Sequence, residues 1–534
     1  MQEGSGRWHV DCSNCNADDD GESACQDSTF RAGLFAKSPA RNSPLEYVAY
    51  TASAGEGMHG TLKTQITRRY HRIPHMKALR RALRLDELGL LLLVLVIYAV
   101  GYIQLTLTTG SAELVPTARG VLRILWPSMA PLLCFVVLSG LTHRFQPLTD
   151  QLLLPMTAFL SGMGLLMSAR LDPSLAILYP DTYPNIDVRQ AIWITFGSVI
   201  YGLIVLVPWD TVLRARTKMT LFDWLAHYRY AWLSIGLLLI VATFVFGSDP
   251  NNSGVRAWLT IGPLTFQPSE LLKILLVIFL ASYLEEYRSQ IDRGVRVWGV
   301  SLPALSALVP LLVMWGMAML LIVLQRDLGA ALMLFSVFLA MIYVATGRGL
   351  YALGGVLAFV VGAVVLYQVL PIVQLRVGLW LDPWTQTRGY QSIQAIFAFA
   401  SGGIFGSGIG LGMPGIVPAA HTDYVFASIG EELGLLGAVG VMLVYLLLAV
   451  RGYGIALRLT GQFSTFAQLL AVGCTTILVV QAFIIIGGNV RLIPLTGITM
   501  PFVSYGGSAV LMNFVVMALL ARVSVQQRGV GEIS

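Results

Sequence analysis

The sequence predicts an all-α polytopic membrane protein with about twelve transmembrane helices and a long external loop. Of its 534 residues, 56% are hydrophobic and only 12% are charged, and the mean hydropathy is +0.70. Soluble domains carry about 25% charged residues. A chain of this length with so few charges must place its apolar surface in lipid, and we expect no nucleic-acid partner.

The amino-terminal region has a different composition from the rest of the chain. Residues 1–60 are rich in Ser, Gly, Asp and Glu and show no sustained apolar periodicity, which is typical of a disordered segment. Basic residues then cluster from Arg68 to Arg84, directly before the first apolar segment. Such a cluster marks the cytoplasmic side of a membrane and can contact anionic lipid. We therefore assign residues 1–85 to a disordered cytoplasmic tail with a basic juxtamembrane end.

Twelve apolar segments follow this tail. With an inside start, the even-numbered loops are cytoplasmic, and these loops carry most of the Lys and Arg, as the positive-inside rule requires. Both termini are then cytoplasmic, and residues 525–534 form a second tail. The expected spans are 88–108, 122–141, 150–169, 189–207, 230–247, 269–284, 302–324, 328–346, 350–371, 433–450, 465–487 and 504–521.

The loops that hold unusual polar residues all fall on the predicted external side. They are residues 248–268, 325–327, 372–432 and 488–503. Four distant parts of the chain thus bring polar groups to one face, which predicts a single site at the external end of the helices.

Glu270 and Lys273 are the most informative pair in the chain. They lie three residues apart at the start of an apolar segment, so a helix would place them on one face. An ionisable residue within a bilayer costs a few kcal/mol or more and is therefore read as functional by default. A purely structural ion pair that joins two helices is the alternative.

The external loop 372–432 is much longer than a simple connection, and such loops are usually functional. Its glycine-dense stretch, 401–412, would let the backbone approach a ligand closely, or would form a flexible re-entrant turn. Glu431 and Glu432 follow His421 and Asp423 at the start of a span. We interpret these four residues as a polar cluster, although acidic residues also favour a helix start by themselves.

Five sequence blocks, in order, resemble the SEDS family (shape, elongation, division and sporulation), which includes FtsW, RodA and SpoVE. Together the blocks span about residues 150–525. They are Val255-Arg256-Ala257-Trp258-Leu259 with Gln267-Pro268-Ser269-Glu270 and Lys273; Gln325-Arg326-Asp327-Leu328-Gly329; Gly389-Tyr390-Gln391 with Gln394; His421-Thr422-Asp423-Tyr424 with Gly430-Glu431-Glu432-Leu433-Gly434; and Pro494-Leu495-Thr496-Gly497 with Pro501-Phe502-Val503-Ser504-Tyr505-Gly506-Gly507-Ser508.

The resemblance implies a peptidoglycan glycosyltransferase of the bacterial cytoplasmic membrane. Members of the family polymerise lipid II at the outer face of this membrane, for cell division or elongation, together with a class B penicillin-binding protein. The family core has ten spans, which here would occupy residues 146–524. Residues 86–145 would then be two added amino-terminal helices.

The chemistry of this reaction needs a base and an anion-binding group. The acceptor hydroxyl is a poor nucleophile, so a carboxylate should accept its proton. Asp382 is the only carboxylate between Asp327 and Asp423, and we expect it to be the catalytic base. The family's second loop acid corresponds to Gln386 here, so the chain departs from the family pattern. An Asx turn before Pro383 is the alternative role for Asp382.

The leaving pyrophosphate calls for Arg, Lys or a divalent cation. The external loops offer several arginines, among them Arg376 and Arg491. No metal-ligand set is complete, since the Cys12–Cys15 pair lacks partners, and a cation is left open. The expected substrate-binding residues are Arg256, Trp258, Glu270, Lys273, Asp327, Arg388, Tyr390, Gln391, His421, Asp423, Glu431, Ser504 and Tyr505.

Two other functions stay open from the sequence. A lipid II flippase or transporter would also have many spans, half-buried charges and Gly/Pro-broken segments. However, no inverted repeat is visible, and the polar blocks gather at the external ends. A non-catalytic activator of a class B penicillin-binding protein would explain why the usual loop acid is missing.

Overall fold

The computed structural model describes most of the chain after residue 73. The predicted tail up to that point, with Cys12 and Cys15, lies outside the described residues. The structure describes residues 74–108, 118–178, 185–249, 256–262, 264–292, 295–297, 300–302, 305–386, 388–459 and 465–530.

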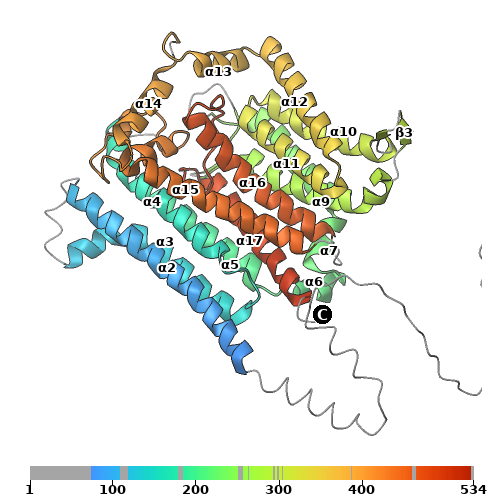
Figure 1. Ribbon diagram of the computed structural model, residues 1–534, viewed down its shortest axis with the longest axis horizontal. Coiled ribbons are helices and arrows are strands. Elements are labelled where there is room, and N and C mark those ends of the chain that lie inside the picture. The colour runs from blue at the N-terminus through green and yellow to red at the C-terminus, as the bar shows by residue number, and fades with distance from the viewer. Residues whose placement is uncertain are drawn as a thin grey trace, which may run out of the picture. The chain divides into compact units, whose positions relative to one another are not determined.

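Helices dominate the described residues, with two short hairpins between them (Figure 1). Ten of the described helices are long and apolar enough to cross a membrane. The predicted class, an all-α polytopic membrane protein, is confirmed. The count of twelve stays a prediction, because two of the expected spans miss the criterion. The helix α9 carries charged residues at both ends, and the apolar part of α10, Leu308–Leu324, is short.

The first half of the chain supplies six longer helices and two short ones. The helix α2 begins at Pro74, so the predicted tail boundary at residue 85 falls inside a helix. The bounds are α2 (Pro74–Thr108), α3 (Ala118–Phe145), α4 (Leu153–Leu178), α5 (Ile186–Leu206), α6 (Trp209–Thr217), α7 (Leu221–His227), α8 (Arg229–Phe246), β1 (Leu259–Ile261), β2 (Leu264–Phe266) and α9 (Pro268–Asp292).

The second half begins with another hairpin and ends with three long helices. Both hairpins are antiparallel, with Leu259 opposite Phe266 and Val295 opposite Leu302. The bounds are β3 (Val295–Val297), β4 (Val300–Leu302), α10 (Leu305–Leu324), α11 (Leu328–Thr346), α12 (Gly349–Val369), α13 (Pro371–Leu381), α14 (Tyr390–Gly402), the 3₁₀ turn η2 (Pro414–Ile416), α15 (Val425–Arg458), α16 (Thr465–Asn489) and α17 (Gly507–Val530).

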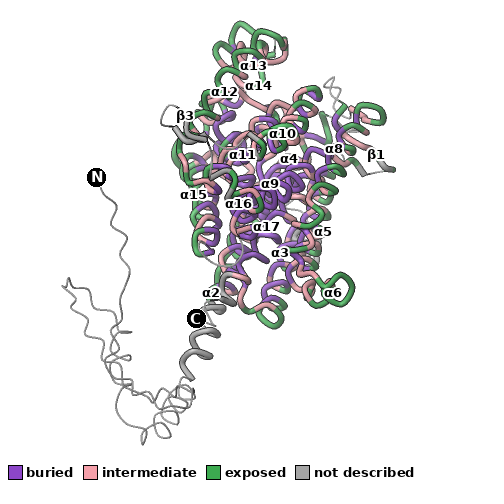
Figure 2. Tube along the Cα trace, turned by 90° about the vertical axis from the view of Figure 1, so that its right-hand side faces the viewer, coloured by how far each residue is buried: buried purple, intermediate pink, exposed green. Residues whose placement is uncertain are grey.

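The core is centred on α4, α9, α16 and α17 (Figure 2). The most apolar windows of α4 and α16 are each 83% buried, whereas that of α12 is 0% buried. Glycine allows the close approach of these helices. A Cβ at Gly473 on α16 would lie 2.4 Å from Val277 of α9 and 3.0 Å from Met341 of α11. Helices that approach this closely without voids bury a continuous apolar core.

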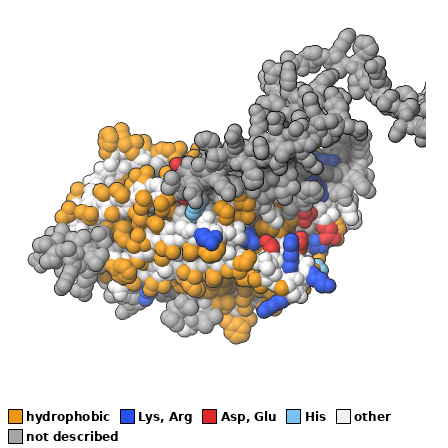
Figure 3. Space-filling model, turned by 90° about the horizontal axis from the view of Figure 1, so that it is seen from below, with side chains coloured by type: hydrophobic (Ala, Val, Ile, Leu, Met, Phe, Trp, Pro, Cys, Tyr) orange, Lys and Arg blue, Asp and Glu red, His pale blue; other side chains and the backbone are white. Residues whose placement is uncertain are grey.

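Outward-facing side chains of the peripheral helices are also apolar. Leu93 on α2, Leu238 on α8 and Leu353 on α12 are all exposed. Seen from below, hydrophobic side chains cover much of the described surface, and charged side chains gather toward one edge (Figure 3). Exposed apolar surface of this extent is what lipid contact requires.

The segment expected to be a long external loop contains helices of its own. It holds α13, α14 and η2, and α15 begins at Val425 rather than at the predicted residue 433. The reason is a break at Gly434, where φ is 67° and ψ is −168° inside α15. Residues 425–433 therefore form a short helical segment before the kink, which the hydropathy of the following span does not reveal.

Candidate functional site

Lys273 is the centre of a polar network between three helices. Its Nζ lies 2.5 Å from Oε2 of Glu270, one turn earlier on α9. The same ammonium donates hydrogen bonds to Gln481 on α16, at 3.0 Å, and to Asn513 on α17, at 3.4 Å. The side chain of Lys273 is fully buried and that of Glu270 is 15% exposed. The ion pair is therefore internal, as a charge in this environment requires.

Asp327 caps the amino terminus of α11 beside this network. Its Oδ1 accepts the Ala330 N–H at 3.0 Å, and its Oδ2 accepts a hydrogen bond from Gln267 at 3.3 Å. Gln267 directly precedes α9, so the hydrogen bond joins the beginnings of α9 and α11. The sequence prediction that these two blocks meet is therefore consistent with the structure.

Arg376 on α13 brings a positive charge between two carboxyl groups. Its guanidinium donates to the Thr496 carbonyl at 2.6 Å. A Cβ at Gly497 would lie 3.6 Å from Oδ2 of Asp423 and 3.9 Å from Nη2 of Arg376, so both groups converge on this glycine. Gly497 has a φ of 75°, a conformation that L side chains rarely adopt.

The protonation equilibria of these groups are shifted. Burial raises the pKa of Asp423 to about 6, Arg376 opposes this rise, and Asp327 adds to it. Burial also raises the pKa of Asp327, and Glu270 contributes in the same direction. Burial lowers the pKa of Arg376, opposed by both aspartates. Acidic groups with raised pKa values beside a buried cation are typical of functional sites.

A second set of contacts joins His421 and Thr422 to Ser504 and Tyr505. The Ser504 hydroxyl donates to the Thr422 carbonyl at 2.6 Å, and the Tyr505 N–H donates to the His421 carbonyl at 2.8 Å. The rings of His421 and Tyr505 lie 5.9 Å apart. Burial lowers the pKa of His421 to about 4, so its imidazole is neutral at physiological pH. The segment before α15 and the start of α17 are thereby held together.

Glu431 and Glu432 bind the glycine-dense segment. Oε1 of Glu431 accepts the Met413 N–H at 2.7 Å, and Oε2 of Glu432 accepts the Gly410 N–H at 3.0 Å. Arg170 on α4 lies 2.6 Å from Glu432 and donates to the Gly412 carbonyl at 2.6 Å. The two glutamates are therefore not simple helix caps, because they fix the backbone of residues 410–413 against α4 and α15.

Asp382 lies at the end of α13 and is exposed. Its Oδ1 accepts the Trp384 N–H at 3.1 Å, and its Oδ2 accepts the Thr385 hydroxyl at 2.9 Å. This is the Asx-turn geometry that the sequence offered as an alternative role. Because the carboxylate oxygens also face solvent, the turn does not bar an incoming hydroxyl, and the assignment of Asp382 as the base stays a prediction.

The remaining predicted substrate residues lie on two exposed segments. Arg388, Tyr390 and Gln391 are exposed at the start of α14. Arg256 is exposed, and Trp258 is half-buried where its backbone pairs with Ser248 before the β1–β2 hairpin. Among the described residues, none of these side chains forms a hydrogen bond with Asp327 or Asp423.

Sequence reasoning missed three members of the buried network. Gln481 and Asn513, which bind Lys273, were not expected, and Arg376 was named only among the external arginines. Polar amides within apolar segments are a usable signal, because buried polar groups need partners. Within the described ranges, no group of three His, Cys, Asp or Glu side chains is placed to hold a metal ion.

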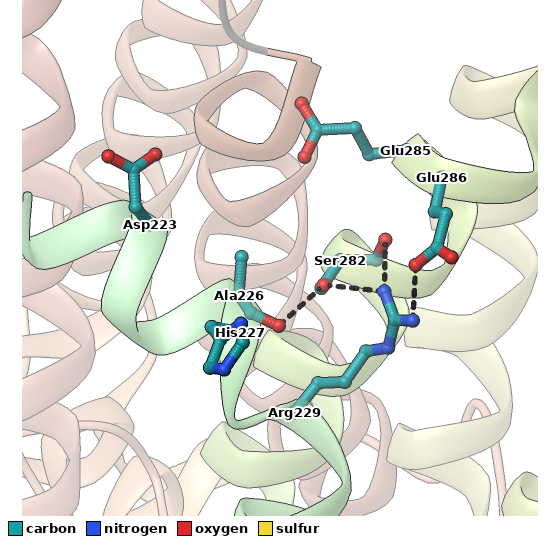
Figure 4. Close-up of a pocket in the computed structure, with 7 residues that line it drawn as sticks. All are labelled: Asp223, Ala226, His227, Arg229, Ser282, Glu285 and Glu286. Atoms are coloured by element: carbon teal, nitrogen blue, oxygen red, sulfur yellow. Dashed lines mark hydrogen bonds and ion pairs between the residues drawn. The ribbon is translucent and has the colours of Figure 1, made fainter. Parts of the chain in front are cut away.

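A hollow of about 320 Å³ lies at the other end of α9, away from these residues. Arg229 forms an ion pair with Glu286 there and donates to the Ser282 hydroxyl at 3.2 Å (Figure 4). Asp223, Ala226, His227 and Glu285 complete its lining. The α9 end that holds this hollow is the predicted cytoplasmic one, so it is separate from the site above.

Comparison with known proteins identifies the family. The model for the cell cycle protein family of FtsW, RodA and SpoVE matches residues 151–529, and the chain belongs to this family. The predicted resemblance is therefore confirmed. The helices α2 and α3 precede the matched range.

Curated relatives and a solved structure agree with this assignment. The peptidoglycan glycosyltransferase RodA of Mycobacterium tuberculosis is 38% identical over 78% of this chain and 87% of its own length. A probable peptidoglycan glycosyltransferase FtsW of Legionella pneumophila is 32% identical over 68% of this chain and 88% of its own length. A chain of a solved peptidoglycan synthase complex, studied for the coordination of polymerization and crosslinking, is 26% identical. It has a TM-score of 0.55 and covers 71% of this chain and 98% of its own.

Proposed function

We propose that this protein is a peptidoglycan glycosyltransferase that polymerises lipid II into glycan strands. Its family membership supports the enzyme class. The observation that carries the proposal for the site is the group of charged residues at the predicted external ends of the helices, in which Lys273 is buried and Glu270, Asp327, Arg376 and Asp423 are half-buried. A bilayer protein retains such charges mainly for function.

The proposed reaction forms a bond between an acceptor hydroxyl and the anomeric carbon of the donor. The hydroxyl oxygen attacks this carbon, the bond to the pyrophosphate oxygen breaks, and undecaprenyl pyrophosphate leaves. A carboxylate accepts the hydroxyl proton, and we assign this role to Asp382. Its exposure at the end of α13 leaves its carboxylate accessible to an acceptor.

Positive charge for the leaving group comes from arginine. Arg388 and Arg256 are exposed on the loops that the topology places outside, so each is free to contact a pyrophosphate. Arg376 lies deeper, and its charge offsets those of Asp327 and Asp423. This group of charged residues thus sets the electrostatic potential at the external ends of the helices, while the exposed loop residues contact the reacting groups.

We further propose that the protein lies in the bacterial cytoplasmic membrane with both termini inside, and that it acts with a class B penicillin-binding protein. The basic residues of the predicted cytoplasmic loops support this orientation. The solved complex, in which a related chain belongs to a peptidoglycan synthase, supports a crosslinking partner.

Polymerisation of fluorescent lipid II by the purified full chain, with and without its transpeptidase partner, tests this function. Glycan strands from the wild type that disappear in Asp382→Asn would support both the activity and the base. Glycan strands that persist in Asp382→Asn would support the polymerase activity and would reject Asp382 as the catalytic base.

The family departure at Gln386 provides a second variant. If the wild type made no strands but Gln386→Asp did, the protein would be a non-catalytic activator of its partner. If neither polymerised, lipid II flipping would be measured in vesicles as the remaining alternative.

A further inference from the structure

The helix α13, which ends directly before Asp382, has little packing of its own. None of its residues is buried, and its neighbour in the chain, α12, has no buried residue either. A helix of 11 residues with no fully buried side chain is only weakly stabilised, because helices in proteins are stabilised mainly by packing. Polar contacts therefore add to what holds α13 in place.

Arg491 and Trp380 supply such a contact in both directions. The Arg491 guanidinium donates to the carbonyl of Trp380 at 2.6 Å and to that of Leu381 at 3.4 Å. The indole Nε1 of Trp380 donates in return to the Arg491 carbonyl at 2.9 Å. The two carbonyls belong to the last turn of α13, where helical acceptors lack partners and a positive charge is favoured by the helix dipole.

Arg491 lies in the turn that ends α16, where the Leu492 N–H donates to the Gly487 carbonyl at 2.7 Å. Its φ is 59°, in the left-handed region that glycine occupies readily and a long side chain does not. A non-glycine residue persists in this region where the surrounding structure fixes it. The side-chain contacts of Arg491 with α13 are part of that surrounding structure.

A second contact ties α13 to the same loop. Arg376, in the middle of α13, donates to the carbonyl of Thr496, five residues after Arg491. Both polar contacts of α13 therefore reach residues 490–506, the loop between α16 and α17. Because α16 and α17 belong to the buried core, we expect the loop between them to hold α13 in a fixed position.

We propose that Arg491 is a positioning residue that fixes α13, and with it Asp382, over the loop between α16 and α17. Asp382 follows Leu381, whose carbonyl Arg491 contacts, so the cap sets where the carboxylate lies. This role rests on the proposed function for its effect on catalysis. This positioning role differs from the direct pyrophosphate contact expected for the external arginines, because the Arg491 guanidinium already donates hydrogen bonds to the end of α13.

The test compares Arg491→Gly with Lys218→Gly in the full chain in lipid nanodiscs. Lys218 is a matched control: it is basic, exposed and has a φ of 61° at the end of α6, in a predicted cytoplasmic loop. Glycine relieves backbone strain at both positions, and only at Arg491 does it remove the cap. The readouts are kcat and KM for fluorescent lipid II, the midpoint of thermal unfolding, and amide exchange of residues 371–386.

For Arg491→Gly we expect kcat to fall about 10- to 100-fold, as small displacements of a catalytic group do. We expect an unchanged KM, faster exchange in α13 and no loss of thermal stability. Lys218→Gly should leave kcat, KM and α13 exchange at wild-type values and should not lower the unfolding midpoint. An unchanged kcat in Arg491→Gly would overturn the proposal, as would an equal fall of kcat in both variants.

Amide exchange separates this proposal from the proposed function. If the wild type did not polymerise lipid II, the proposed function would be rejected, and the amide exchange of α13 would still test the role of Arg491. Faster exchange in Arg491→Gly would support that role, and unchanged exchange would reject it. Trp380→Phe, which removes the indole donor and keeps an aromatic ring, should show a smaller effect in the same direction. Combined with Arg491→Gly it should add little, because the two residues form one contact.

Discussion

The ammonium of Lys273 lies 2.5 Å from the carboxylate of Glu270 and reaches two other helices from a fully buried position. The pair is thus more than a contact within α9. Since Gln481 also donates to the Thr499 carbonyl at 2.8 Å, the network continues into the loop that supports α13.

Replacing Lys273 by Met should destabilise the protein by roughly 3–5 kcal/mol, because it leaves Glu270 and two amide oxygens without their cation. Glu270→Gln should cost less, since its carboxylate is partly exposed. The double variant should recover part of the loss of Lys273→Met. Thermal unfolding in detergent micelles measures this, and a double variant less stable than Lys273→Met would contradict the model of a coupled pair.

The buried pair of Arg170 and Glu432 should matter more than an exposed pair of the same chemistry. The Glu432 side chain is 0% exposed, whereas Glu286, paired with Arg229, is 51% exposed. We expect Glu432→Gln to cost roughly 3 kcal/mol or more and to speed amide exchange in residues 403–413. The matched Glu286→Gln should cost about 0–1 kcal/mol. Equal losses in the two variants would show that the clamp on the glycine-dense segment is unimportant.

Asp423 should make stability depend on pH. Its folded pKa of about 6 lies above its ordinary value, so the folded state binds its proton more tightly. Stability from this group is therefore present at low pH and is lost as pH rises toward 6, by up to roughly 3 kcal/mol. Asp423→Asn should thus raise the unfolding midpoint relative to wild type at pH 7.5 and change it less at pH 4.5. The same difference at both pH values would show that Asp423 does not titrate in this range.

Gly434 should be the least replaceable glycine of α15. Its φ is 67°, and a Cβ there would lie 2.2 Å from the Gly406 nitrogen. Gly434→Ala should cost at least about 1–3 kcal/mol from backbone strain alone. The control is Gly440→Ala on the same helix, where a Cβ meets nothing within 4 Å and alanine should favour the helix. Circular dichroism measures the unfolding midpoints of the two variants in micelles. A midpoint of Gly434→Ala at or above that of Gly440→Ala would contradict the prediction.

Much of the site was predictable from sequence because its residues break strong local patterns. Glu270, Lys273 and Asp327 interrupt apolar segments, and the positive-inside rule placed their loops on one side. The structure brings Glu270, Lys273, Asp327 and Asp423 into one neighbourhood, as expected. Gln481 and Asn513 were missed because an amide within an apolar helix gives a weak signal unless its partner is known.

The long loop was the part that sequence patterns described least well. Hydropathy marked it only as less apolar, and therefore hid the early start of α15 and the kink at Gly434. A kink depends on what packs beside it: the Gly403 and Ile404 carbonyls accept the N–H groups of Leu435 and Leu436. These partners are about 30 residues away in the chain, beyond the range of any local rule.

The sequence by itself determined that this chain is a helical membrane protein, because composition, periodicity and charge asymmetry are local properties that decide whether a segment enters lipid. Its five sequence blocks carried the resemblance to the family. Only the tertiary structure decided that Arg376 lies between Asp327 and Asp423, and that Arg491 caps α13 rather than standing free in a loop. Those relationships join segments more than 40 residues apart. They depend on how buried charges and unpaired helix ends find partners once the helices have packed.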